Sequence, residues 1–271
     1  MTDHDTRRQR GLDVLSTLSG SEDGGRALAG FFDTQGALGS IALHTAAGEV
    51  WSRSQFSRRD RSLVVISALT ALGREVELRQ HVAGGLNHGL TRDEVDEIMV
   101  QLGAYVGMPF AFGGAEIVAQ VFAGFDGTEH RAAPPPPAEP KENTQRRLDG
   151  LDVLQTLLGM PEGVDMSAVA AATVEQLGDM GNLVVDFAFG EIWARPQLSR
   201  RDRSVVVISA LAATNMTREL EIHIGGALNH GVTRKEVEEV MVTMVPYCGF
   251  PRAIEGFRLA RKVFADRDAI S

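Results

Sequence analysis

The feature that most constrains the fold of this chain is an internal duplication. Residues 51–109 match residues 193–251 at a constant offset of 142, and 34 of these 59 positions are identical. The duplication begins earlier, because residues 10–15 and 149–154 share Gly-Leu-Asp-Val-Leu at an offset of 139. Each copy has the length of an ordinary domain, whereas a solenoid repeat is much shorter. We therefore predict two tandem homologous domains.

A proline-rich segment separates the two copies. Four consecutive prolines occupy positions 134–137, and they favour an extended, semi-rigid segment that cannot continue a helix. The predicted organisation is a first domain at residues 1–128, a linker at 129–144 and a second domain at 145–271.

Helix signals dominate each copy. Ser57-Arg-Arg-Asp60 and Thr91-Arg-Asp-Glu94 have the spacing of helix capping boxes. The stretch after the first box is apolar nearly all round, which indicates a buried central helix. Its Val-Val-Ile run would also suit a buried strand, but its length and its Ala and Leu residues favour a helix. We predict an all-α fold, with helices at residues 8–18, 24–45, 61–72, 75–88 and 111–123, and with 166–186 and 253–265 as second-copy equivalents.

Composition limits the class of partner and the compartment. The net charge is −9 without a concentrated Lys/Arg face, so no nucleic-acid partner is predicted. Arg58-Arg-Asp-Arg61 and Arg200-Arg-Asp-Arg203 are interrupted by Asp, which favours salt-bridged helix starts over phosphate binding. The single cysteine, Cys248, permits no intramolecular disulfide. Neither a signal-peptide pattern nor an unbroken apolar run of about 18 residues is present, so we predict a cytoplasmic protein without a membrane partner.

Glu77 and His81 recur as Glu219 and His223 in the second copy, although residues 79–80 and 221–222 between them differ. A spacing of four residues places both side chains on one face of a helix. A carboxylate next to an imidazole would orient the ring and raise its pKa, which suits general acid–base catalysis near neutral pH. The alternative is a surface salt bridge. We take these four residues as the catalytic candidates.

A second set of repeated residues could bind a substrate. His88 and His230 end the same helices, where a cationic histidine would also suit the helix dipole. Each Trp is followed two residues later by an Arg that could grip a carboxylate, although a packing Trp beside an exposed Arg is equally compatible with the pattern. The candidate substrate-binding residues are Trp51, Arg53, His88, Trp193, Arg195 and His230.

The spacing argues against two other chemistries. A metal site built from Glu77, His81 and His88 lacks the zincin spacing, so no metal site is predicted. Ser62 and Ser67 occur in both copies, but no Gly-x-Ser-x-Gly elbow surrounds them. A serine nucleophile is therefore not favoured.

Taken together, the motifs resemble those of the carboxymuconolactone decarboxylase family. The second copy carries Gly190-Glu-Ile-Trp193-Ala-Arg195, Glu219-Leu-Glu-Ile-His223, Leu228-Asn-His-Gly-Val-Thr233 and Tyr247-x-Gly-x-Pro251 in the family's order. The first copy has the same order from Gly48 to Pro109. The resemblance covers most of both copies and implies an all-α fold for each.

The resemblance also separates two branches of this family. In the peroxidase branch a Cys-x-x-Cys pair attacks the peroxide, but Arg74 and Glu77 stand at the two cysteine positions here. Met216 and Glu219 stand there in the second copy, and Ser62 replaces the glutamate of that branch's proton relay. The chain is similar instead to the γ-carboxymuconolactone decarboxylase branch, which uses no cofactor and assembles as a ring of about six domains.

The resemblance implies an enzyme that decarboxylates a small carboxylated lactone or a related carboxylic acid, with His81 and His223 moving the proton. Lactone hydrolysis, isomerisation or another biosynthetic step could use the same groups. A non-catalytic, ring-forming binding protein is a further alternative. Because the family's usual single domain is duplicated here, three chains would form a pseudo-hexameric ring as a homo-oligomer.

Overall fold

The computed structural model describes residues 2–125 and 139–270, and within these ranges it contains helices and no strands, which confirms the predicted all-α class. The first copy contains α1 (Asp3–Leu18), α2 (Glu22–Asp33), α3 (Gly36–Ile41), the π-helix η1 (Ala42–Trp51), α4 (Arg58–Ala71), α5 (Glu75–Asn87), α6 (Arg92–Gly103) and α7 (Met108–Phe125). The second copy contains α8 (Asn143–Leu158), α9 (Met166–Leu177), α10 (Asp179–Leu183), the π-helix η2 (Val184–Trp193), α11 (Arg200–Thr214), α12 (Thr217–Asn229) and α13 (Arg234–Ile270). Most of the predicted linker, 129–144, lies outside the described residues.

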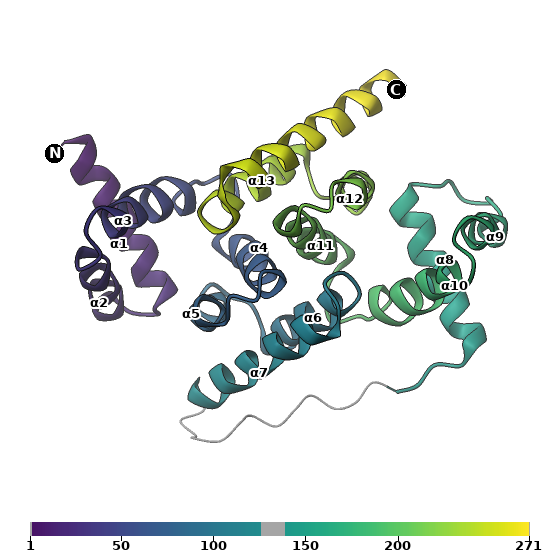
Figure 1. The fold of residues 1–271 in the computed structure, drawn as a ribbon, viewed down its shortest axis with the longest axis horizontal. Helices are drawn as coiled ribbons and strands as arrows, with labels where there is room; N and C mark the ends of the chain where they lie inside the picture. The colour runs from purple at the N-terminus through teal and green to yellow at the C-terminus, as the bar shows by residue number, and fades with distance from the viewer. Residues whose placement is uncertain (1, 126–138, 271) are drawn as a thin grey trace.

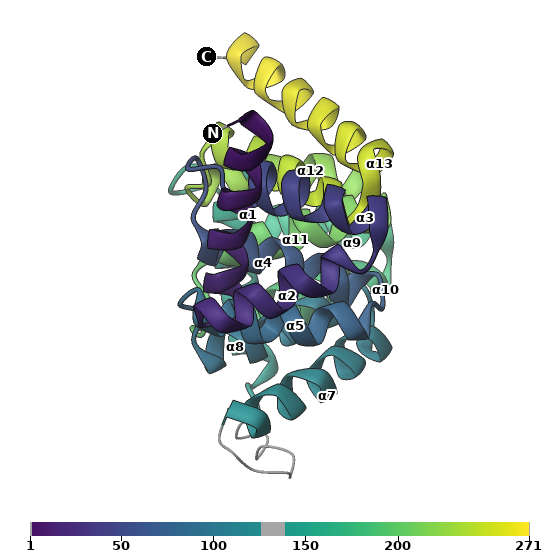
Figure 2. The ribbon, with the colours of Figure 1, turned by 90° about the vertical axis from the view of Figure 1, so that its left-hand side faces the viewer.

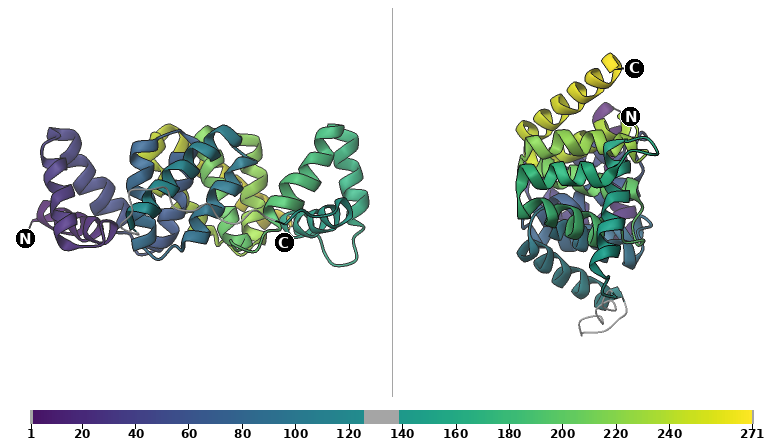
Figure 3. Two further views of the ribbon diagram at one scale, coloured as in Figure 1. Left: turned by 90° about the horizontal axis from the view of Figure 1, so that it is seen from below. Right: turned by 90° about the vertical axis from the view of Figure 1, so that its right-hand side faces the viewer.

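The helices form three groups along the longest axis of the molecule (Figure 3). Helices α1–α3 with η1 lie at one end, and α8–α10 with η2 lie at the other (Figure 1). The middle group combines α4–α7 of the first copy with α11–α13 of the second, and α4 packs against α11 within it. The last turns of α13 extend beyond the rest of the molecule (Figure 2). The two copies are therefore joined through a central block to which both contribute.

Helices α4 and α11 form the centre of this block because they are apolar on nearly every side. All residues from Arg61 to Ala71 are buried, and so are all residues from Asp202 to Ala213. Ser57 and Ser199 each accept a hydrogen bond from the backbone N–H three positions later, so both helices begin at their predicted caps. The prediction of a helix instead of a strand for this stretch is confirmed.

Close helix packing positions the Trp at the end of η1. Helix η1 crosses α1 so closely that a Cβ atom on Gly11 would lie 2.3 Å from the Leu43 carbonyl oxygen. A Cβ atom on Gly48 would lie 2.3 Å from the Arg7 carbonyl oxygen. Only glycine leaves room for this contact between backbones. The paired glycines therefore allow η1 to lie against α1 and to end with Trp51 facing the central block.

Glycines with positive φ divide helices that the sequence predicts as continuous. The single helix predicted at 24–45 is wrong, because Gly36 has φ 60° and separates α2 from α3. The helix predicted at 166–186 is likewise divided at Gly178, which also has φ 60°. In α13, Gly249 has φ 80° and ψ 161°, which breaks the helical path at this residue. Positive φ lies outside the right-handed helical region, so each of these glycines ends one helical segment.

Within the described residues, α7 is the helix that is long and apolar enough, by length and composition, to cross a membrane. It packs against α5 and α6 in the central block. Its Val118 is fully buried there. One side of α7 therefore packs in the core, whereas Phe112 on the same helix is 70% accessible.

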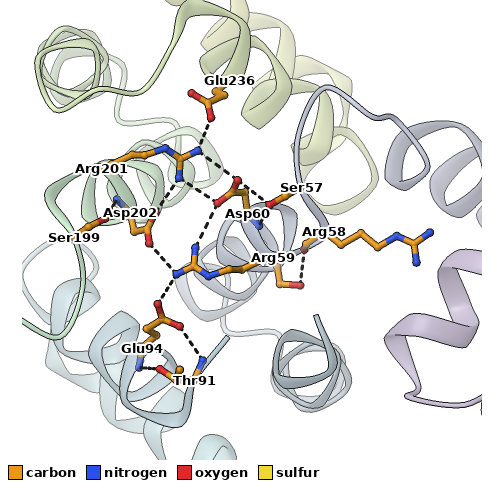
Figure 4. Close-up of polar contacts among 11 residues, drawn as sticks. Ser57, Arg58, Arg59, Asp60, Thr91, Glu94, Ser199, Arg201, Asp202 and Glu236 are labelled. Atoms are coloured by element: carbon orange, nitrogen blue, oxygen red, sulfur yellow. Dashed lines mark hydrogen bonds and ion pairs between the residues drawn. The ribbon is translucent and has the colours of Figure 1, made fainter. Parts of the chain in front are cut away.

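A network of ion pairs joins the starts of α4 and α11 (Figure 4). Arg59 Nη2 lies 2.9 Å from Asp202 Oδ2, and Arg201 Nη1 lies 3.1 Å from Asp60 Oδ1. Each arginine also pairs with the capping-box glutamate of its own copy. The predicted salt-bridged helix starts are confirmed, and their ion pairs link the two copies.

Candidate active site

Each copy brings its Trp and two of its histidines together. Trp51 ends η1, whereas His81 lies on α5 and His88 lies at the end of that helix. The Trp51 ring centroid is 5.7 Å from that of His81 and 5.6 Å from that of His88. The second copy repeats this arrangement with separations of 6.0 and 5.6 Å. Six predicted site residues thus form two matching clusters, which are Trp51, His81 and His88 in site 1 and Trp193, His223 and His230 in site 2.

A tyrosine from the second copy completes site 1. The Trp51 indole N–H donates a hydrogen bond to the Tyr247 hydroxyl oxygen at 2.8 Å. The same hydroxyl lies 3.3 Å from His81 Nε2, and the two rings meet edge to face. Site 1 is therefore built from both copies.

Site 2 has the reciprocal arrangement. Trp193 donates to the Tyr105 hydroxyl oxygen at 2.7 Å, and the Tyr105 ring lies edge-on to His223 with centroids 5.1 Å apart. Neither tyrosine is among the predicted site residues, although both belong to the repeated Tyr-x-Gly-x-Pro motif. The motif was the available signal, but spacing along the chain does not show which copy's histidine a tyrosine approaches.

Two hydroxyl groups hold the second histidine of each site. His88 Nδ1 lies 2.9 Å from Ser62 Oγ, and His88 Nε2 lies 3.1 Å from Thr17 Oγ1. Thr17 donates its own hydrogen to the Val14 carbonyl, so it accepts from His88 Nε2, whereas the Ser62 hydroxyl lies within hydrogen-bond distance of both His88 Nδ1 and the Arg58 carbonyl oxygen. Site 2 has both contacts at the same distances. Both ring nitrogens of this histidine are thus engaged by the protein.

Burial keeps the four histidines neutral. The pKa of His81 is lowered from 6.5 to about 3 by burial and then by His88. The pKa of His223 is lowered to about 4 by burial and then by His230. For His88 and His230, burial and then a neighbouring arginine lower the pKa to about 4. An imidazolium in these surroundings lacks its hydration shell, so the charged form is disfavoured unless an anion lies beside it.

The predicted carboxylate–imidazole pair is not formed. Glu77 and Glu219 are exposed, whereas Nδ1 of both His81 and His223 is buried without a hydrogen-bond partner among the described residues. The pKa of each of these histidines is also lowered, not raised. The physical reason is that the histidine turns toward the interface between the copies, where an accompanying carboxylate would lose its hydration.

Arg53 and Arg195 bind carboxylates that belong to the protein. Arg53 Nε donates to both Glu239 oxygens at 3.1 and 2.9 Å, and Arg195 Nε donates to both Glu97 oxygens at 2.8 and 2.9 Å. Both pairs connect one copy to the other. A substrate contact by either arginine stays a prediction.

Arg195 also lines a groove of about 890 Å³ between α7 and η2. Most of the other lining side chains are apolar, and Met99, Phe112 and Phe122 are among them. Within the part of the chain that the structure describes, no group of three or more His, Cys, Asp or Glu side chains is placed to hold a metal ion.

The fold and sites define a class of protein, a duplicated helical protein with two Trp–His–Tyr clusters that lie between its copies. The model of the carboxymuconolactone decarboxylase family matches residues 37–120 and 178–262, which is more than half of the chain. The chain belongs to this family.

Curated relatives agree with this assignment. The 4-carboxymuconolactone decarboxylase of Acinetobacter baylyi is 36% identical over 116 residues, which cover 43% of this chain and 87% of the relative. The nitrosuccinic acid decarboxylase npaB of Metarhizium robertsii is 32% identical over 127 residues, which cover 46% of this chain and 87% of the relative. Peroxisomal protein 2 of Schizosaccharomyces pombe is 33% identical over 60 residues, covering 22% of this chain and 28% of that protein. The chain is a carboxy-lyase-like enzyme of this family.

Proposed function

We propose that the protein decarboxylates a small carboxylated lactone or a related carboxylic acid by acid–base chemistry that requires no cofactor. The observation that carries this proposal is that Nδ1 of His81 and of His223 is buried and has no hydrogen-bond partner among the residues that the structure describes. An unsatisfied buried polar group is unfavourable by about 1–3 kcal/mol, so a ligand group that bonds to it is favoured. Two relatives are named as decarboxylases of carboxymuconolactone and of nitrosuccinic acid, which supports the substrate class.

A bound carboxylate would change the charge balance of site 1. Its negative charge beside His81 favours the imidazolium and raises the low pKa of the resting ring. Loss of CO2 breaks a carbon–carbon bond and leaves its electron pair on the substrate carbon. The imidazolium donates its proton to that carbon, and the ring regains one proton from water for each CO2 released. The Trp51 ring, which stacks on His81, excludes water from this face of the site.

Release of CO2 from 4-carboxymuconolactone and from nitrosuccinic acid tests this function. We expect His81→Ala combined with His223→Ala to lower turnover by about 10²–10⁴-fold, because general acid–base catalysis contributes that much. His4→Ala is the matched control, since His4 is exposed on α1 and we expect turnover to be unchanged. Full turnover in the double variant contradicts the mechanism. Product formation without CO2 favours the alternative of hydrolysis or isomerisation, and a ligand that binds without any product favours a binding protein.

We also propose that the protein is a cytoplasmic homo-oligomer in which three chains form a ring of six domains. The exposed apolar side chains of Phe112 and Phe250, which are 70% and 66% accessible, support a further interface between chains. Light scattering of the purified protein measures the mass of the assembly. A mass of one chain contradicts the ring.

A further inference from the structure

Each site depends on a tyrosine from the other copy. The chain contains two tyrosines, Tyr105 and Tyr247. Each accepts the indole N–H of the opposite copy's Trp. Tyr247 is 166 residues away from His81, the histidine that it approaches. No third tyrosine exists in the sequence, so no other phenol of this chain can take either place.

The contacts of Tyr247 indicate where its hydrogen lies. The Trp51 indole N–H can only donate, so the phenol oxygen accepts this bond and keeps its own hydrogen to donate. His81 Nε2 lies 3.3 Å from that oxygen. If Nε2 carried the imidazole hydrogen, the phenol hydrogen and the Nδ1 lone pair would both be left unpaired. Donation by Tyr247 leaves only the Nδ1 hydrogen without a partner in the described part of the chain, and buried polar groups are rarely left unpaired.

Burial keeps both groups in the protonation states that this arrangement needs. The pKa of the Tyr247 hydroxyl is raised by burial, and the opposing effects of the Trp51 bond and of Arg61 are smaller. The pKa of His81 is lowered by burial to about 3. The phenol therefore remains a donor and the ring remains neutral in the absence of a ligand.

We propose that Tyr247 and Tyr105 are positioning residues that the two copies exchange, so that Nδ1 of the opposite copy's histidine faces the carboxylic acid substrate. Tyr247 engages His81 through Nε2, and Tyr105 orients His223 through the edge-on contact of their rings. The inference rests on the function proposed above and adds the identity of the reacting nitrogen. It also means that neither copy holds a complete site, because site 1 requires residues 51–88 together with Tyr247. Site 2 requires the corresponding residues of the second copy together with Tyr105.

Pairs of substitutions in the full chain test the exchange. H81A/Y247F alters site 1 twice and leaves site 2 intact, whereas H81A/Y105F alters both sites. The two variants carry the same types of substitution, so each is the matched control for the other. We expect CO2 release by H81A/Y105F to be about tenfold or more below that by H81A/Y247F. When H223A replaces H81A, we expect the opposite order, with H223A/Y247F less active than H223A/Y105F. Testing both histidine substitutions allows for an enzyme in which one site has most of the activity.

The contrary result is equally clear. The inference fails if H81A/Y105F is at least as active as H81A/Y247F and if H223A/Y247F is also at least as active as H223A/Y105F. The tyrosines would then not serve the site of the opposite copy. Thermal unfolding of each variant shows whether the phenylalanine substitutions leave the protein folded. They remove one hydroxyl and keep the ring, so we expect the folded state to be retained.

A spectroscopic measurement separates this inference from the proposed function. In nitrogen NMR of the full chain with labelled histidine, we expect the His81 hydrogen on Nδ1. We expect Y247F to shift the ring nitrogens of His81 and not those of His223, and Y105F to do the reverse. A hydrogen on Nε2 of His81, or a His223 shift caused by Y247F alone, overturns the inference. If the spectra are as expected but the protein releases no CO2, the proposed function is contradicted, whereas the exchange of tyrosines between the copies still holds.

Discussion

Site 1 and site 2 have the same Trp, two His, Ser and Tyr, and their Trp–Tyr hydrogen bonds measure 2.8 and 2.7 Å. Helices α5 and α12, which carry the site histidines, differ at residues 79–80 and 221–222. These residues are Arg-Gln in the first copy and Glu-Ile in the second. Arg79, Gln80 and Ile222 are exposed, and Glu221 is partly exposed. On α5 and α12 the two copies therefore agree in the site histidines and differ in side chains that face outward. This difference favours two working sites over one site with a structural copy.

A second difference lies behind the sites, at the fully buried Arg61 and Arg203. Each pairs with a glutamate of the other copy, at 2.9 and 2.7 Å respectively. Arg61 also donates to the Thr243 hydroxyl, whereas Arg203 donates to the Gln101 side-chain carbonyl. Thr243 has a further bond to a backbone carbonyl, but Gln101 Nε2 has no partner among the described residues. The Gln101 side chain behind site 2 thus depends on Arg203 for its hydrogen bonding, whereas Thr243 behind site 1 has a second partner.

The largest effect is expected from removing either buried arginine. Arg203→Met leaves the buried Glu97 beside the partly exposed Arg195, and Arg61→Met leaves the buried Glu239 beside the partly exposed Arg53 and, at 3.9 Å, Lys235. Each substitution lowers the free energy of unfolding by about 3–5 kcal/mol. Arg203→Met should cost about 1 kcal/mol more, because the Gln101 amide then loses its bond to Arg203. Urea unfolding of the two variants measures the difference. Losses below about 1 kcal/mol would show that the pairs do not hold the copies together.

The pH dependence of stability compares the two buried histidines directly. His81 and His223 titrate near 6.5 in the unfolded chain, but their folded pKa values are about 3 and about 4. As the pH falls from 6.5 to 4, the unfolded chain therefore binds protons that the folded chain does not, and stability decreases. Above pH 6.5 neither histidine contributes to this effect. Each contributes a slope of at most about 1.4 kcal/mol per pH unit.

We expect His81→Asn and His223→Asn to reduce that slope by equal amounts, as measured by urea unfolding between pH 6 and pH 4.5. The slope is the diagnostic quantity, because each substitution also removes ring contacts that affect stability at every pH. A slope that changes for one variant and not for the other would show that the two histidines lie in different environments. Site 1 and site 2 would then not be equivalent.

Much of the fold follows from local patterns in the sequence. Ser57 begins α4 because its hydroxyl caps the helix, and the apolar run that follows is buried as predicted. The duplication predicts that whatever forms around His81 forms again around His223. The local pattern does not predict the break at Gly36, since a glycine within an apolar pattern is compatible with either a helix or a turn.

The site itself was predictable only in part, because its contacts cross between copies. Trp51 and Tyr247 are 196 residues apart, and no spacing rule connects them. The pairing of Glu77 with His81 was expected from local helix geometry, but burial of the ring against the other copy outweighs that geometry. Long-range packing decides which groups surround each histidine, and a single sequence does not contain that information in its periodicity.

The smallest expected effect concerns the ion pairs between Arg59 and Asp202 and between Arg201 and Asp60. The two arginine side chains are each 26% accessible, so water and salt screen their charges more than those of the buried pairs. We expect Arg59→Ala and Arg201→Ala to lower the free energy of unfolding equally, by about 0.5–1 kcal/mol at low ionic strength. Urea unfolding at about 0.05 M and about 1 M salt measures the loss, which should shrink at the higher concentration. A loss of several kcal/mol that salt does not change would show that this network behaves like the pairs of the buried arginines. Unequal losses for the two substitutions would show that the copies are not equivalent where α4 meets α11.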